Sequence, residues 1–587
     1  MRLWSRKPFA AMVMSLLLVG SIGRAAEPSG KEPVWEGTLK VRPGAELRLV
    51  IHVTKGDGGA LTGTLDSPDE GFKELKLSSI TLDKSRLAFE LKVSGANYDG
   101  KLNAGGTEAV GTWTQHGASV PLTLSKKDRA TPEPKLVGKE QVWEGKLEAG
   151  AGVRLRLVVR LAKAESGEML GTFESLDQSA QKLKLNSVTL DKSRLAFELK
   201  LVGGKYEGKL NAEGTEATGT WSQGGAKLPL TLKKTDKAAE VRRPQTPKPP
   251  YPYKSEAVTY PNKSGGVTLA GTLTTPGGPG RFPAVILISG SGAQDRDETI
   301  FQHKPFLVLA DTLTRRGVAV LRVDDRGVGG STGNTSKSTS EDFAGDVLAG
   351  IAFLKSRPEI DSKKIGLAGH SEGGLIAPMV AARSNDVAFI VLLAGTGLPG
   401  EEISYIQGRL IGKVMGADEK ALDKQRDIQK QLFEIVKTET NHDKMMMRLR
   451  EAIKKMWSNL SEEERKAVGD ADSLVESQAK MVESPWFRFF LTFDPRPTLA
   501  KVRCPVLALD GEKDLQVPPK ENLAEIEKAI KKGGNARVTV KELPGLNHLF
   551  QTCKTGSVAE YGAIEETISP VALKAISDWV VEQVKRH

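Results

Sequence analysis

One stretch decides the fold of the C-terminal half of this chain: residues 365–382, which read IGLAGHSEGGLIAPMVAA. An apolar strand, Ile365–Ala368, leads into Gly369-His370-Ser371-Glu372-Gly373, and a helical segment, Leu375–Ala382, follows. Gly-x-Ser-x-Gly between a strand and a helix is typical of a nucleophile elbow, where the glycines permit a strained turn that exposes the serine hydroxyl. The stretch therefore predicts that Ser371 is a nucleophile at the start of a helix.

The sequence around this stretch alternates between buried strands and helices. Residues 282–288 and 318–323 are continuous apolar runs, and helical segments follow them at 304–316 and 340–355. Parallel strands joined by helices are buried on both faces and therefore lack an alternating polar side. We expect an α/β domain with a doubly wound, mostly parallel sheet over residues 255–587.

A serine hydroxyl is a weak nucleophile unless a general base takes its proton, and the base needs an acid that orients it. His548 is the predicted base, because it lies in a loop between the strand at 536–543 and the last helix. His370 adjoins the serine but is expected to point away from the elbow. His303 precedes the serine, against the chain order Ser, acid, His, and is predicted to be structural.

The orienting acid is expected after a strand that lies between the serine and His548. Residues 505–509 form that strand, and Asp514 in the loop after it is the predicted acid. Asp510 lies too close to the end of the strand, and Glu512 is the alternative. The predicted catalytic residues are therefore Ser371, Asp514 and His548.

Acyl transfer also needs backbone N–H groups directed at the developing oxyanion, each worth roughly 3–4 kcal/mol. The N–H of Glu372, the residue after the nucleophile, would supply one. The second is expected from the Gly-rich loop 289–292 after the first core strand, with Ser291 as the predicted donor and Gly292 as the alternative. The sequence has neither a Gly-Lys-Ser/Thr phosphate loop nor a His/Asp/Glu set at metal-ligand spacing, so neither a cofactor nor a metal is predicted.

The N-terminal half contains a duplicated module. The segment TLDKSRLAFELK occurs at 81–92 and again at 189–200, and three aromatic pairs recur at the same offset. These pairs are Trp35 and Trp143, Tyr98 and Tyr206, and Trp113 and Trp221. Short apolar strands bounded by Gly, Asn or Asp predict an antiparallel meander closed as a small barrel or sandwich. We expect two β-rich repeat domains, at 31–128 and 139–236.

Residues 1–26 have the order of a secretory signal peptide: basic residues, an apolar run, and small residues at the end. We therefore expect export to the periplasm or the extracellular space, and no stable membrane insertion after cleavage. Four of the charges in the net +11 belong to this segment, at Arg2, Arg6, Lys7 and Arg24. The remaining excess is expected to be solvated surface, and no nucleic-acid partner is predicted.

Two further segments connect or cover these domains. Residues 237–254 are rich in Pro, Lys and Arg and predict a stiff, extended linker. The insert at 398–502 has Leu, Ile and Met at helical spacing and predicts a helical cap. Two apolar runs in it, Met445–Met447 and Trp486–Phe490, either line an acyl pocket or pack as the core of the cap.

Five motifs of the C-terminal half resemble those of α/β-hydrolases, in particular the bacterial carboxylesterases related to the EstD esterase and the serine aminopeptidase-like hydrolases. They lie at 289–298, 325–329, 369–373, 511–518 and 547–551. The resemblance implies a serine esterase that cleaves carboxylic esters of small or short-acyl substrates through an acyl-enzyme intermediate. A peptidase or aminopeptidase of the same fold is one alternative, and a cell-envelope binding protein with a subsidiary hydrolase half is another.

The duplicated module resembles an N-terminal domain found ahead of some bacterial secreted hydrolases. The resemblance rests on the patterns Trp-Glu-Gly-x-Leu, Tyr-x-Gly-Lys-Leu-Asn-Ala and Gly-Thr-Trp-x-Gln, which both copies contain. It identifies no ligand: binding of a cell-envelope component or glycan and a purely spacing role both stay open. If the loop at 65–71 binds a ligand, the diverged loop at 173–179 is expected to bind it less well.

Overall fold

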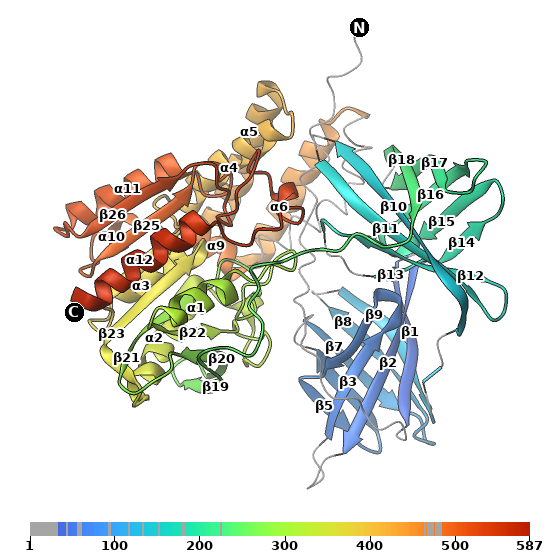
Figure 1. Cartoon of the computed structure of the whole chain (residues 1–587), viewed down its shortest axis with the longest axis horizontal. Coiled ribbons are helices and arrows are strands. Elements are labelled where there is room, and N and C mark those ends of the chain that lie inside the picture. Colours follow the sequence, from blue (N-terminus) through green and yellow to red (C-terminus); the bar gives the residue numbers. More distant parts are fainter. Residues whose placement is uncertain are drawn as a thin grey trace. The chain divides into compact units, whose positions relative to one another are not determined.

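The structure is a computed structural model. It describes residues 33–42, 45–55, 61–91, 95–115, 118–128, 130–131, 134–150, 153–178, 182–223, 226–462, 465, 475 and 484–586. These residues fall into two compact units, one ending at Val241 and one beginning at Arg242 (Figure 1). The predicted signal peptide lies outside the described residues.

The unit before Val241 contains two antiparallel sheets of nine strands each. The first comprises β1 (Val34–Arg42), β2 (Ala45–Lys55), β3 (Leu61–Ser67), β4 (Phe72–Lys76), β5 (Ser79–Leu82), β6 (Arg86–Leu91), β7 (Ala96–Leu102), β8 (Glu108–Gln115) and β9 (Ala118–Lys127). The second comprises β10 (Leu136–Gly150), β11 (Val153–Ala164), β12 (Met169–Ser175), β13 (Leu183–Lys184), β14 (Ser187–Leu190), β15 (Arg194–Leu199), β16 (Gly204–Leu210), β17 (Glu216–Gln223) and β18 (Ala226–Thr235). In the first sheet β1 pairs with β9, and β4 and β5 form the edges; the second repeats this order with β10, β18, β13 and β14.

Each of these sheets curls around a single apolar core, which is the arrangement of a small barrel rather than of two facing sheets. The repeated aromatic residues lie in these cores. The buried hydroxyl of Tyr98 donates to the carbonyl oxygen of Ala109 at 2.9 Å, and Tyr206 donates to Ala217 at 2.8 Å. Gly111 is required where two strands approach closely, because a Cβ there would collide with the carbonyl oxygen of Asp99.

The loop at 65–71 lies where the first module contacts the second. It contains a short 3-10 helix, η2 (Pro68–Glu70). The carboxylate of Asp69 accepts a hydrogen bond from the backbone N–H of Arg48 at 2.7 Å and pairs with Lys184 of the second module at 3.2 Å. In the second copy Asp177 accepts from the N–H of Arg156 at 2.6 Å. This acid therefore has the same local structural role in both copies.

Several residues of the Pro/Lys-rich segment 237–254 pack against folded parts of the chain. Ala238 and Val241 pack on an apolar cluster of the second module. From Arg242 on, the segment belongs to the C-terminal unit, where the guanidinium of Arg243 donates to the carbonyl oxygens of Phe301 at 2.7 Å and Gly562 at 2.8 Å. The segment predicted as an extended linker therefore packs on both units over part of its length.

The C-terminal unit is built on one eight-stranded sheet. Its strands, in spatial order, are β19 (Lys254–Asn262), β20 (Val267–Thr275), β22 (Ala319–Val323), β21 (Phe282–Ile288), β23 (Ile360–His370), β24 (Phe389–Leu393), β25 (Val506–Gly511) and β26 (Val538–Leu543). The pairings from β22 to β26 are parallel, and β20 pairs antiparallel with both β19 and β22. The predicted doubly wound, mostly parallel sheet is confirmed.

Helices cover both faces of this sheet (Figure 1). One apolar cluster joins the sheet to α2 (Ser340–Ser356), α3 (Glu372–Ala381) and α11 (Pro519–Lys532), beside the short α10 (Arg496–Leu499). A second cluster joins the opposite face to α1 (Pro305–Arg315) and α12 (Pro570–Arg586). The central strands are apolar on both sides because each side packs against helices.

Within the described residues between β24 and β25, four helices form a cap. They are α4 (Gly400–Val414), α5 (Glu419–Thr438), α6 (His442–Ser458) and α9 (Pro485–Thr492), and they share an apolar core. Met445 and Met446 are buried in this core, whereas Met447 is 54% exposed. Core packing therefore accounts for the first two methionines. Within the described parts of the chain, no helix is long and apolar enough to cross a membrane.

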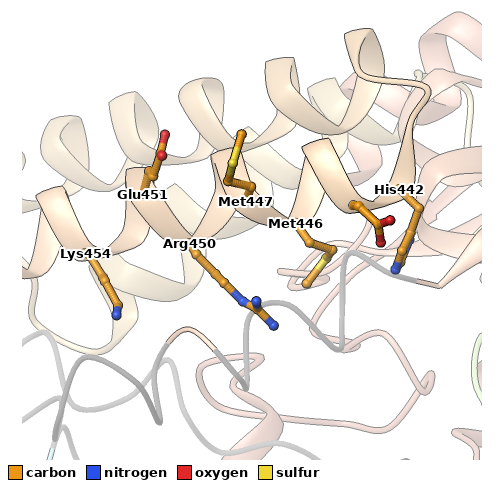
Figure 2. A pocket seen from close by; sticks show the side chains of 7 residues that line it. His442, Met446, Met447, Arg450, Glu451 and Lys454 are labelled. Carbon is orange, nitrogen blue, oxygen red and sulfur yellow. The ribbon is translucent and has the colours of Figure 1, made fainter.

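A shallow surface pocket runs along α6 and is shown in Figure 2. Its lining combines two methionines with polar and charged side chains: His442, Asp443, Met446, Met447, Arg450, Glu451 and Lys454. None of the predicted catalytic or oxyanion-hole residues lines this pocket, so the pocket does not connect the methionine run with the predicted site. The site that the sequence predicts lies instead at the carboxyl ends of the strands of the C-terminal sheet.

Candidate active site

Ser371 lies in a sharp turn between β23 and α3. Its backbone has φ 52° and ψ −112°, a conformation that a residue with a side chain rarely adopts. The backbone N–H of Ser371 donates to the carbonyl oxygen of Leu393 at 2.8 Å, and this hydrogen bond stabilises the turn. Glycine is required on both sides: a Cβ on Gly369 would collide with Gly373, and one on Gly373 would collide with the carbonyl oxygen of Ile288. This is the geometry of a nucleophile elbow.

His548 and Asp514 form a buried pair on neighbouring loops. His548 Nδ1 lies 2.6 Å from Asp514 Oδ2, and the two residues are 5% and 2% exposed. Asp514 Oδ1 accepts the backbone N–H groups of Gln516 at 2.7 Å and Val517 at 2.9 Å. Burial by itself would raise the pKa of Asp514, but the charge and hydrogen bond of His548 outweigh it and lower that pKa. Asp514 is therefore an ionised acceptor that orients the imidazole.

The loop of His548 is braced by the residues around it. Asn547 Oδ1 accepts the N–H groups of Leu549 at 3.0 Å and Gln551 at 2.9 Å. His303 is fully buried behind the loop, with Nδ1 at 2.9 Å from Thr567 Oγ1 and its other nitrogen at 3.0 Å from Gln551 Nε2. Burial lowers the pKa of His303 to about 4, so this imidazole is neutral. It supports the loop from behind.

The structure separates the other two candidate acids. Glu512 Oε2 accepts the N–H of Gly545 at 2.8 Å and thus closes a turn. Asp510, at the end of β25, is fully buried, and its carboxyl interacts with that of Asp514. Since both groups are carboxyls, one of them must carry the proton. Burial and then the charge of Asp514 raise the pKa of Asp510 well above its usual range, which assigns the proton to Asp510.

Replacing Asp510 with asparagine is expected to stabilise the protein at alkaline pH. A carboxyl with a raised folded-state pKa contributes stability that is complete below its unfolded pKa of about 3.9 and is lost as the pH rises. Asparagine stays neutral and still donates to Asp514. Thermal unfolding at about pH 8 should show a Tm higher by about 2–4 °C, and the difference should vanish near about pH 4. A lower Tm at both pH values would contradict a protonated Asp510.

The loop after β21 passes directly beside the nucleophile. A Cβ placed on Gly290 would lie 3.4 Å from Ser371 Cβ, so this part of the loop lies in van der Waals contact with the nucleophile. Ser291 follows on an exposed part of this loop, and Gly292 has φ 102°, which suits glycine. On the other side of the nucleophile, Glu372 begins α3. The predicted N–H donors of Ser291 and Glu372 therefore lie in segments adjoining Ser371.

Two side chains that the sequence analysis did not assign to the site also adjoin it. Glu298 comes from the loop after β21, and His370 is the residue before the nucleophile. His370 Nδ1 lies 2.9 Å from Glu298 Oε1, and Nε2 lies 3.0 Å from the backbone oxygen of His548. Both contacts of His370 are therefore with the loops that build the site. No spacing rule pairs a glutamate with a histidine so far along the chain.

The side chain of Glu372 is directed into the protein. Ser340 Oγ donates to Glu372 Oε1 at 2.6 Å, and burial raises the pKa of this carboxyl to about 7. The two cysteines, Cys504 and Cys553, are not joined by a disulfide. Among the residues that the structure describes, no group of three or more His, Cys, Asp or Glu side chains is placed to hold a metal ion.

The doubly wound sheet, the elbow serine at the end of β23 and the helices inserted between β24 and β25 show that the C-terminal unit has the α/β-hydrolase fold. Residues 304–552 match the model of the serine aminopeptidase S33 family within this fold. Esterase EstD of Thermotoga maritima is 35% identical to this chain over 135 residues. That match covers 23% of this chain and 32% of the relative, so the chain spans about a third of the length of the curated relative that it matches.

Solved structures also align with the chain at low sequence identity. Est1E from Butyrivibrio proteoclasticus, solved with ferulic acid, aligns with a TM-score of 0.33 and 18% identity, over 56% of this chain and 100% of its own. The Pyrococcus furiosus esterase Pf2001 aligns with a TM-score of 0.35 and 17% identity, over 59% and 97% of the two chains. The hypothetical protein PA2218 from Pseudomonas aeruginosa aligns with a TM-score of 0.35 and 16% identity, over 60% and 99%.

Proposed function

We propose that this protein is a serine hydrolase that cleaves carboxylic esters of small or short-acyl substrates. The observation that carries the proposal is the elbow serine together with the buried His548–Asp514 pair at 2.6 Å. Because Nδ1 of His548 faces the carboxylate of Asp514, its Nε2 is left to act on the hydroxyl of Ser371. The similarity to an esterase over part of the chain supports the choice of an ester as substrate.

The reaction would proceed by two acyl transfers. Ser371 Oγ attacks the ester carbonyl while His548 takes the hydroxyl proton. The tetrahedral oxyanion accepts hydrogen bonds from the backbone N–H groups of Ser291 and Glu372. Collapse breaks the bond to the alcohol, which leaves with the proton from His548, and the acyl group stays on Ser371. Water then attacks the acyl carbon while His548 takes its proton. Collapse of this second intermediate breaks the bond to Ser371 Oγ, which takes the proton back from His548, and the acid is released.

A fluorophosphonate probe and an ester series test this proposal directly. The probe should label the full-length protein at Ser371, as located by peptide mass spectrometry. Hydrolysis of p-nitrophenyl esters should be fastest for acetate or butyrate and fall as the acyl chain lengthens. Neither labelling nor turnover of any ester would overturn the proposal.

An aminopeptidase is the second candidate, and the match to the serine aminopeptidase model favours it. Such an enzyme needs an acidic group that binds the free amine of the substrate. Comparison of aminoacyl p-nitroanilides with simple p-nitrophenyl esters separates the two activities. Preferential cleavage of the anilides, with loss of that preference after acetylation of the substrate amine, would favour the peptidase.

We further propose that the protein is exported and that its β modules bind a cell-envelope component or glycan. The charge and apolar order of residues 1–26 supports export, and the duplication of the module supports a ligand-binding role. N-terminal sequencing of the protein from the expressing cell would show whether the leader is cleaved. Co-sedimentation of the full chain with insoluble cell-wall glycan would test whether the β modules bind such a ligand. If the same fraction of the protein stays in the supernatant with and without glycan, glycan binding is contradicted.

A further inference from the structure

We propose that Glu298 and His370 are positioning residues that lock the oxyanion loop and the base loop onto the nucleophile elbow. This inference rests on the proposed ester hydrolysis. The two side chains take no part in bond making or breaking. They act through the backbone of Gly290 on one side and of His548 on the other.

A continuous chain of contacts joins the three segments. Glu298 Oε1 accepts the N–H of Gly290 at 2.6 Å, next to the predicted donor Ser291. The same oxygen lies 2.9 Å from His370 Nδ1, and His370 Nε2 lies 3.0 Å from the backbone oxygen of His548. Glu298 and His370 are 4% and 8% exposed, so water does not compete freely for these groups. The donor, the nucleophile and the base are thus connected through one buried pair.

The contacts require that His370 is an imidazolium. A carboxylate oxygen and a backbone carbonyl oxygen only accept hydrogen bonds, so both ring nitrogens must donate. Burial opposes this charge, but the charge and hydrogen bond of Glu298 outweigh it and raise the pKa of His370. The other ionisable groups around the pair are Asp514, the His548 ring at 4.8 Å between centroids, and the half-buried Asp325, whose pKa is raised by desolvation.

The loop that carries Glu298 is strained in order to direct this side chain inward. Glu298 has φ 51°, in the left-handed region that residues with side chains avoid. Such a conformation persists where the surroundings impose it, and it is frequent at functional sites. Here Asp295 holds the turn, since its Oδ1 accepts the N–H of Thr299 at 2.9 Å and its Oδ2 accepts the Thr299 hydroxyl at 2.7 Å.

This clamp matters because acyl transfer depends on alignment within about 0.5 Å. Gly290 runs against the nucleophile, so a shift of its peptide moves the adjoining oxyanion donor relative to Ser371. Loss of the His370 contact also frees the backbone that carries the base. A misplacement of about 1 Å can lower the rate by about 100-fold without removing any reacting group.

The test is the Glu298→Gln variant of the full-length protein, assayed with p-nitrophenyl butyrate from about pH 5 to about pH 10. We expect kcat near neutral pH to fall by about 10- to 100-fold, with KM changed by less than about threefold. The contact from His370 to His548 is present while His370 is protonated and is lost as the pH rises through its pKa. Removal of the carboxylate lowers that pKa, so the alkaline limb of kcat should move to lower pH.

Two further variants complete the test. Glu582→Gln is the matched control, because Glu582 pairs with Arg586 on the exposed end of α12 and should keep the wild-type profile. Glu298→Asp keeps the charge but shortens the side chain, and it should lower kcat while the alkaline limb stays close to its wild-type position. If Glu298→Gln does not fold, Glu298→Asp decides the matter by its kcat.

The proposal is overturned if kcat of the glutamine variant equals that of the wild type at every pH. A profile that is scaled down uniformly, with its alkaline limb unmoved, would equally overturn it, because that is the result of a merely structural role. Wild-type kcat in a folded aspartate variant, when the glutamine variant does not fold, would do the same. Failure of the proposed function is distinguishable, since the wild type itself would then show no ester turnover that depends on Ser371.

Discussion

Replacement of Ser371 by alanine is expected to lower kcat for p-nitrophenyl acetate and butyrate by about 10⁴-fold or more. The hydroxyl at the elbow is the group that becomes acylated, and no other residue can replace it at that point of the turn. The folded state should persist, because Ser371 contributes its backbone N–H to Leu393 and an alanine keeps that bond. The measurement is the steady-state rate, together with loss of fluorophosphonate labelling.

The matched control for this experiment is Ser384→Ala. Ser384 lies just beyond α3, where its hydroxyl accepts the N–H of Asp386 at 3.2 Å on the exposed surface. Its substitution should leave both turnover and labelling at the wild-type level. Substantial ester turnover by the Ser371→Ala protein, free of contaminating esterase, would remove Ser371 from the mechanism.

Replacement of Asp514 by asparagine is expected to lower kcat by about 10⁴-fold near neutral pH. The carboxylate accepts the Nδ1 proton of His548, whereas the amide of asparagine can donate to Nδ1 and so place the proton on Nε2. That tautomer has no lone pair with which to take the proton of Ser371. Structural damage should be small, because asparagine has the same shape and its oxygen can still accept the N–H groups of Gln516 and Val517.

Glu512→Gln discriminates between the two acids that the sequence left open. Glu512 only closes the turn at Gly545, and a glutamine oxygen accepts the same N–H, so kcat should stay within about threefold of the wild type. A large loss of kcat in Glu512→Gln with nearly full activity in Asp514→Asn would reverse the assignment. Rates should be compared at equal folded fraction, measured by thermal unfolding.

Much of the C-terminal fold was predictable because its signals are local. Helices cover both faces of the sheet, so its central strands carry apolar side chains on both sides. In the sequence such a strand is a continuous apolar run, as at 282–288. The elbow is likewise visible locally: Gly369 is needed by a close contact with Gly373 within the turn, and Gly373 by the close approach of Ile288 in the neighbouring β21. The order of serine, acid and base along the chain then leaves few candidates.

The N-terminal modules were predictable as β repeats that close as a small barrel or a sandwich, but neither the choice between these two nor the contact between the modules was predictable. Duplication makes the strands and core aromatics visible, yet the pairing of β1 with β9 joins residues far apart in sequence. The sequence leaves the role of the loop at 65–71 open. Its Asp69 pairs with Lys184 of the next module, a contact that no local pattern encodes.

The sequence by itself determined the class of the C-terminal domain, the elbow serine and the candidates for acid and base, because these depend on strand–turn–helix patterns and chain order. Only the tertiary structure decided which side chains act on one another. It placed Asp514 rather than Glu512 at 2.6 Å from His548, and it brought Glu298 to His370 across a separation that sequence periodicity does not reach. The physical reason is that parallel strands end at one edge of the sheet, so loops distant in sequence meet there. Ionisable side chains of these loops are buried together and therefore interact with one another.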